Sequence, residues 1–172
     1  MTIDIVRQRL RNQRLASPEF QKPGDVVAWL GAVQAQDFAG AKWAVGLRAR
    51  GITDGDVERE FDTGSILRTH LLRPTWHNDE YLIAYKDRGS VLESHPAASR
   101  GAVEYPHHLV VDGKVRGSWK RTLGMKAAAL EVRPFRPLPE SDASALAAEA
   151  ARYGRFLNLP VTLVARPMNE SP

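Results

Sequence analysis

Residues 25–38, DVVAWLGAVQAQDF, place an apolar helical pattern directly before two glutamines. Four apolar residues recur at the i, i+3, i+4, i+7 spacing of one helical face: Val26, Trp29, Leu30 and Val33. If this helix continued through residue 36, Gln34 and Gln36 would flank that face, about 200° apart around the axis. The two amides could meet one small group only if the helix ended or bent near residue 35.

Two roles are open for this polar segment on its residues alone. Gln34 and Gln36 could be boundary residues whose amides bond to nearby backbone carbonyls. Asp37 is a good N-cap for a following helix, and its carboxylate could also stabilise a cation. Nothing in the periodicity alone selects a catalytic role over a structural one.

Composition predicts a folded protein without disulfides. The chain has 172 residues, enough for one domain or two small ones, and 43% of them are hydrophobic. It contains no cysteine and no run of 18 apolar residues, which argues against thiolate metal sites and membrane spans. The charged N-terminal stretch lacks the apolar core of a signal peptide. We therefore expect a cytoplasmic location with no membrane partner.

The pattern along the chain predicts an α+β fold. Short helices dominate the first part, and strands, hairpins and one long helix dominate the second. Winged-helix domains, with three helices and a β-hairpin wing, have this order, and the C-terminal portion reads as hairpin, helix and strand. The expected helices are 3–15, 25–36, 41–51, 53–64 and 141–159, with Asp25 and Ser141 as caps. The expected strands are 65–77, 107–111, 114–123, 127–138 and 160–167, with a tight turn at Asp112-Gly113. Residues 79–90 are expected to be extended and then to form a short helix or turn, and residues 93–106 to form a loop.

Basic residues gather in one stretch. The whole chain carries a net charge of +4, whereas residues 112–136 hold seven basic residues against Asp112 and Glu131. Such a surplus suits a polyanionic partner, and a solvated basic face is the alternative.

Seven residues on two expected elements are candidate DNA contacts. Those on the expected strand 65–77 could face phosphate or form a solvated strand face: Arg68, Arg73 and His77. Those on the hairpin could bind phosphate or stack on a base: Arg116, Trp119, Lys120 and Arg121. Packing of Trp119 on the final helix is the alternative for that residue. The histidines lack metal-ligand spacing, so no metal and no cofactor is expected.

The segments DVVAWLGAVQAQDFAGAKWAVGLRAR and DVEREFDTGSILRTHLLRPTWH resemble the winged-helix DNA-binding family that contains the AlkZ-type DNA glycosylases. The runs VVDGKVRGSWKRTL, EVRPFRPL and YGRFLNLPV are similar to the C-terminal portion of that family. Its members excise alkylated or crosslinked N7-purine bases with a Gln-x-Gln signature. The resemblance implies that Gln34 and Gln36 are the catalytic pair, that alkylated duplex DNA is the partner, and that no cofactor is needed.

The chain also departs from that family. The N-terminal pattern stops at His77 and the C-terminal pattern begins at about Asp79, so the chain looks like an internally deleted member. We expect residues 1–77 and 78–172 to form two segments packed as one unit. Three functions follow as hypotheses: a DNA-binding glycosylase, a DNA-binding module without catalysis, and a folded remnant or homo-oligomer subunit.

Overall fold

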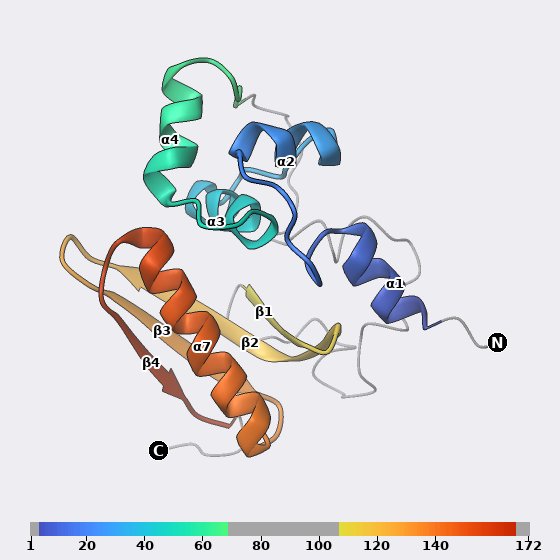
Figure 1. Ribbon diagram of the computed structural model, residues 1–172. Helices are drawn as coiled ribbons and strands as arrows, with labels where there is room; N and C mark the ends of the chain where they lie inside the picture. The colour runs from blue at the N-terminus through green and yellow to red at the C-terminus, as the bar shows by residue number, and fades with distance from the viewer. Residues whose placement is uncertain (1–3, 69–106, 168–172) are drawn as a thin grey trace. The chain divides into compact units, whose positions relative to one another are not determined.

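The computed structural model describes residues 4–68 and 107–167, which form helices and one β-sheet (Figure 1). The helices are α1 (Ile5–Asn12), α2 (Pro23–Leu30), α3 (Phe38–Arg48), α4 (Asp54–Asp62) and α7 (Glu140–Leu157), and the strands are β1 (His107–Val111), β2 (Lys114–Leu123), β3 (Ala128–Pro134) and β4 (Val161–Ala165). This mixture confirms the predicted α+β class. The expected elements between residues 69 and 106 lie outside the described residues.

The chain divides into two compact units. A helical unit comprises residues 7–84 with 156–158, and a sheet unit comprises residues 1–6, 85–155 and 159–172. The division of the sequence at residue 78 and the packing of its two segments as one unit stay predictions, because residues 69–106 are not described.

Helix α2 is shorter than its apolar pattern predicts. Pro23 occupies its first turn and Lys22 is the N-cap, so Asp25 lies inside the first turn and the prediction that it caps the helix is wrong. The helix ends at Leu30, since Gly31 leaves the helical conformation with φ 76° and ψ −38°, a positive φ that glycine adopts readily. Of the predicted stripe, Val26 is fully buried, whereas Trp29 is half exposed.

Helix α3 begins earlier than predicted because Asp37 caps it. The Asp37 carboxylate accepts a hydrogen bond from the Gly40 backbone N–H at 3.1 Å. A side-chain carbon at Gly40 would collide with that carboxylate, so glycine makes this close cap possible. The helix ends at Arg48, where Ala49 becomes extended and forms a bridge to Phe20.

Helix α4 begins with a reciprocal capping box. The Thr53 hydroxyl accepts from the Asp56 backbone N–H, and the Asp56 carboxylate accepts from the Thr53 backbone N–H at 2.8 Å. Thr53 also donates its hydroxyl to that carboxylate at 2.7 Å. Residues 65–68 then continue without forming a strand, so the strand predicted for 65–77 is wrong in its described part.

The helical unit packs around small and branched side chains with one arginine among them. Val26, Val45 and Val57 are buried, and Arg48 has no exposed surface. The Arg48 guanidinium donates to the carbonyls of Gln13 at 2.9 Å and Ala44 at 2.8 Å. These bonds satisfy a group that is costly to bury, and they tie the end of α1 to α3.

Among the described residues of the sheet unit, four strands form one sheet in the order β1-β2-β3-β4. The first three are antiparallel, and β4 runs parallel to β3 at the edge, as predicted for the last strand. The β1–β2 turn is the predicted Asp112-Gly113 pair, with φ values of 49° and 72°. Two consecutive positive φ angles are typical of the type I′ hairpin turn.

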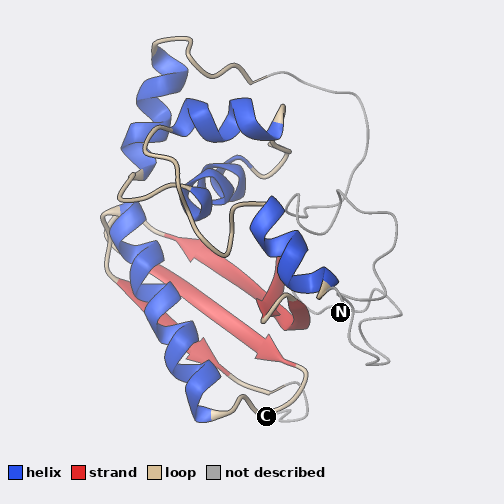
Figure 2. Cartoon of the chain, turned by 45° about the vertical axis from the view of Figure 1, so that its right-hand side comes forward, coloured by secondary structure: helices blue, strands red, loops and turns tan. Residues whose placement is uncertain are grey.

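Helix α7 lies along one face of this sheet (Figure 2). Along β3, Ala128, Leu130, Val132 and Pro134 are buried, and the residues between them are half exposed. Tyr153 of α7 is buried and meets Trp119 of β2 edge to face, with 6.5 Å between ring centroids. The helix starts at Glu140, so the prediction that Ser141 caps it is wrong.

Substitution of Asp37 tests the role of its carboxylate as a cap. Asp37→Ala should lower the free energy of unfolding by about 1 kcal/mol, because it removes the acceptor for the Gly40 N–H. Asp37→Asn should cost much less, since asparagine caps nearly as well. Urea unfolding followed by circular dichroism measures both. Equal losses in the two variants would show that the charge, and not the cap, matters.

The capping box predicts a pH-dependent stability. Hydrogen bonds from the Thr53 side chain and backbone hold the pKa of Asp56 below 3.8. A lowered pKa adds stability above the ordinary value, and this is lost as the pH falls through the folded value. Asp56→Asn should therefore be less stable than the parent at pH 7, by about 1 kcal/mol. Urea titrations should show this difference shrinking below pH 3.8; a constant difference would contradict the prediction.

Candidate functional site

The glutamines lie in an irregular segment between two helices. We call residues 31–36 the glutamine loop; it joins the end of α2 to the cap of α3. Gly31 ends the first helix three residues before Gln34, and Asp37 starts the next helix directly after Gln36. The prediction that residues 25–36 form one helix is wrong, because Gly31 turns the backbone out of the helical conformation.

This early end brings the two amides together. The Gln34 side chain donates from Nε2 to the Gln36 Oε1 at 3.2 Å. Gln34 is half-buried and Gln36 is exposed, so the pair is not sealed within the core. A loop conformation thus places side by side two groups that a regular helix would separate by about 200°. The exposed amide of Gln36 lies at the surface of the helical unit, whereas the Oε1 atom of Gln34 is buried.

Arg68 lies against the same loop. Its Nη2 donates to the backbone carbonyl of Ala35, the residue between the glutamines, at 3.0 Å. Its guanidinium carbon is 4.8 Å from the centroid of the Phe38 ring, a cation–π distance. The sequence predicts only a DNA contact for Arg68, and no spacing in it signals the bond to Ala35.

A partly buried ion network lies next to Phe38. Lys42 is 7% exposed, and its ammonium group donates to Asp54 and to Glu58 at 2.7 Å each. Burial by itself lowers the pKa of Lys42, but the hydrogen bonds from the two carboxylates outweigh it and the net shift is upward. Lys42 therefore stays charged at neutral pH, and it also lies 5.1 Å from the Phe38 ring centroid.

On the hairpin, Trp119 makes contacts within the protein. Its ring lies 4.7 Å from the His107 ring and packs on Tyr153, and its Nε1 donates to the His108 carbonyl at 3.2 Å. These contacts are those expected for the packing alternative, and contact with DNA stays a prediction. Burial lowers the pKa of His108, so this ring carries no charge near pH 7.

The predicted basic residues of β2 do not form one patch. Side chains alternate along a strand, so Arg121 shares the α7 face with Trp119, and Lys120 lies on the opposite face. Arg121 approaches His107 Nε2 at 3.0 Å, and Lys120 pairs with Glu131 at 3.2 Å. The β1–β2 pairing shifts at Arg116, and the backbone carbonyl of this residue accepts a hydrogen bond from the Phe135 N–H at 2.8 Å.

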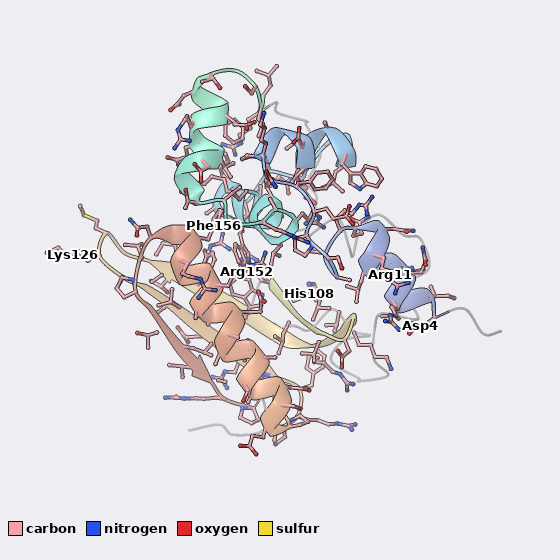
Figure 3. All side chains as sticks on the ribbon, viewed as in Figure 1. Asp4, Arg11, His108, Lys126, Arg152 and Phe156 are labelled. Atoms are coloured by element: carbon pink, nitrogen blue, oxygen red, sulfur yellow. The ribbon has the colours of Figure 1, made fainter. Side chains whose placement is uncertain are left out.

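The β2–β3 turn is a further exposed feature. Residues 124–127 form this hairpin tip, which is closed by a bond from the Gly124 N–H to the Ala127 carbonyl at 2.9 Å. Met125 is 98% exposed, and Lys126 lies beside it at the end of the hairpin (Figure 3). In the sequence, Lys126 belongs to the basic stretch 112–136, but nothing there predicts the hairpin tip as a DNA contact. The exposure of the tip depends on the β2–β3 register.

The remaining candidates add no site. Arg73 and His77 lie outside the described residues. Within residues 4–68 and 107–167, no three histidine or acidic side chains are grouped to hold a metal ion. None of the helices that the structure describes is long and apolar enough to cross a membrane.

Comparison with known proteins gives one match. The family model described as "AlkZ-like: DNA glycosylase AlkZ-like" matches residues 27–78 and 78–156. No curated protein and no solved structure matches the chain. The two matched segments cover more than half of the sequence and include the glutamine loop, Arg68 and the hairpins. The chain therefore belongs to the AlkZ-like DNA glycosylase family.

Proposed function

We propose that this protein binds alkylated duplex DNA and excises N7-alkylated purines, with Gln34 and Gln36 as the catalytic pair. The observation that carries the proposal is the contact between the two amides, 3.2 Å apart in a loop that is not buried in the core. Membership of the AlkZ-like DNA glycosylase family supports the same reaction class. A cytoplasmic location is part of this proposal.

Neutral amides suit this substrate. An N7-alkylated purine is already positively charged and leaves without being protonated, so the enzyme needs no strong acid. Its tasks are to hold the flipped nucleotide and to place a water beside the sugar. Each glutamine has two N–H donors and one carbonyl acceptor, so a pair in contact can still orient a water. Asp37 is engaged as the cap of α3, which leaves this work to the amides.

Binding to DNA is supported by cations on both units. Arg68 lies at the glutamine loop, and Arg116, Lys120 and Arg121 lie on β2. At the hairpin tip, exposed Met125 stands beside Lys126, and methionine is among the apolar side chains that proteins insert between base steps. The order of α2, α3 and α4 before the hairpins supports a winged-helix relationship, which we include in the proposal.

A second function is DNA binding without base excision. The two segments matched by the family model meet at residue 78, which supports an internally deleted family member. Excision requires placement of the base and the water to about an ångström, and a shortened chain has fewer residues to form the pocket. A homo-oligomer in which a second copy supplies the missing surface is the remaining alternative.

Substitution of each glutamine separates these functions. Gln34→Ala and Gln36→Ala should each lower the release of N7-methylguanine by about 10²-fold or more, the scale of losing one positioned catalytic group. Single-turnover assays on methylated duplex DNA measure this effect. Folding should change little, because Gln36 is exposed and Gln34 is only half-buried. Asp37→Asn is the matched control, and it should keep most of the activity because the cap is preserved.

The outcomes of this assay are distinct. Parent protein that shifts methylated DNA in a gel but releases no base would favour the binding module. Release that survives both glutamine substitutions would place catalysis elsewhere in the chain. A large loss in Asp37→Asn with unchanged stability would assign a catalytic role to the carboxylate.

Salt dependence tests the DNA-binding surface. Lys126→Ala should reduce the slope of log affinity against log salt by about 0.9 if Lys126 contacts one phosphate. Lys120→Ala is the matched control and should change the slope less, because Glu131 already neutralises Lys120 at 3.2 Å. Fluorescence anisotropy with a duplex at several salt concentrations gives both slopes. Equal slopes in the parent and Lys126→Ala would remove the hairpin tip from the DNA interface.

A further inference from the structure

Arg68 links a distant part of the chain to the peptide that carries both glutamines. It lies 33 positions after Ala35 in the sequence, and its Nη2 bonds the Ala35 carbonyl at 3.0 Å. Since Ala35 stands between Gln34 and Gln36, this bond restrains the backbone from which both amides project. No hydrogen bond within a helix can do so, because the glutamine loop lies between α2 and α3.

The side chain of Arg68 is itself held in place. Its guanidinium stacks at 4.8 Å on Phe38, which also meets Phe61 edge to face at 5.3 Å. Phe38 is the first residue of α3, and Lys42, one turn later, is fixed by Asp54 and Glu58 of α4. These contacts form a continuous path from α4 through Lys42, Phe38 and Arg68 to the glutamine loop.

The charge of Arg68 indicates what it binds outside the protein. A guanidinium has five N–H donors, and the bond to Ala35 uses one of them, so this exposed side chain can bind a second acceptor. A fixed cation repels a cationic N7-alkylated base and attracts a phosphate. The planar guanidinium also matches phosphate geometry, which an ammonium group does not.

We propose that Arg68 is a positioning residue of the excision site. Its guanidinium donates at the same time to the Ala35 carbonyl and to the DNA phosphate beside the flipped nucleotide. Binding of that phosphate then fixes the backbone between Gln34 and Gln36, so that DNA binding and amide placement are coupled. This inference rests on the proposed function of the glutamines and adds to it the group that positions them.

Three variants test the inference: Arg68→Ala, Arg68→Lys and the control Arg59→Ala. Arg59 is an exposed arginine of α4 that pairs with Asp56 at 2.9 Å. Three quantities are measured on each: the affinity for methylated duplex DNA, the single-turnover rate of N7-methylguanine release at saturating DNA, and the NMR resonances of the Gln34 and Gln36 side-chain amides without DNA.

Arg68→Ala should lower the rate at saturating DNA by about 10-fold to 10²-fold, the scale of a misplaced catalytic group, and should shift both glutamine resonances. Arg68→Lys keeps the charge, so its affinity should stay within a few-fold of the parent while the rate still falls. Arg59→Ala should keep the parent rate and resonances. A simple electrostatic role would instead weaken the affinity and leave the saturated rate unchanged.

The result that overturns the inference is an Arg68→Ala variant with the parent rate and unshifted resonances. If Gln34→Ala is then inactive, the proposed function stands and only the role of Arg68 fails. If the parent protein releases no base, the proposed function fails. In that case the side-chain amide resonances of Gln34 and Gln36 are the test of the positioning role. A shift in Arg68→Ala but not in Arg59→Ala supports this role, and no shift rejects it.

Discussion

The end of α2 at Gly31 is the constraint on which the candidate site depends. A regular helix would carry Gln34 and Gln36 to opposite sides of its buried face. The positive φ of Gly31 ends α2 three residues before the first glutamine, and Asp37 starts α3 as its cap. Between these two points the chain is not helical, and the Gln34 amide contacts the Gln36 amide.

A loop of this kind has no ladder of backbone hydrogen bonds, so its conformation depends on contacts from outside. Arg68 supplies one at the Ala35 carbonyl, and Phe38 and Lys42 hold Arg68 and α3 in turn. The buried Lys42 is stable in this position because Asp54 and Glu58 both pair with it. The glutamine loop is thus positioned by Arg68, which follows α4 in the chain, and by the contacts of Phe38 and Lys42 in α3.

In the sheet unit, the position of a residue along its strand determines the face of the sheet on which its charged side chain lies. The basic residues of β2 are close in sequence, yet alternation along the strand separates Lys120 from Arg121, and Glu131 and His107 meet them. Trp119 is engaged by His107 and Tyr153. The exposed end of the β2–β3 hairpin, with Met125 and Lys126, is therefore a stronger candidate for contact with DNA than a count of charges indicates.

The sequence by itself determined the features that depend on local chemistry. Neighbouring residues are enough to predict the α+β class, the Asp112-Gly113 turn, the edge strand and the Gln-x-Gln motif. The family match agrees with the resemblance. The length of α2 was predicted wrongly, because its apolar pattern continues beyond Gly31 and the backbone does not. Only the tertiary structure decided that Arg68 reaches Ala35, that Lys42 pairs with α4, and that the hairpin cations lie on different faces. These are contacts between residues far apart in the chain or across strands, and neither periodicity nor spacing specifies which of them form.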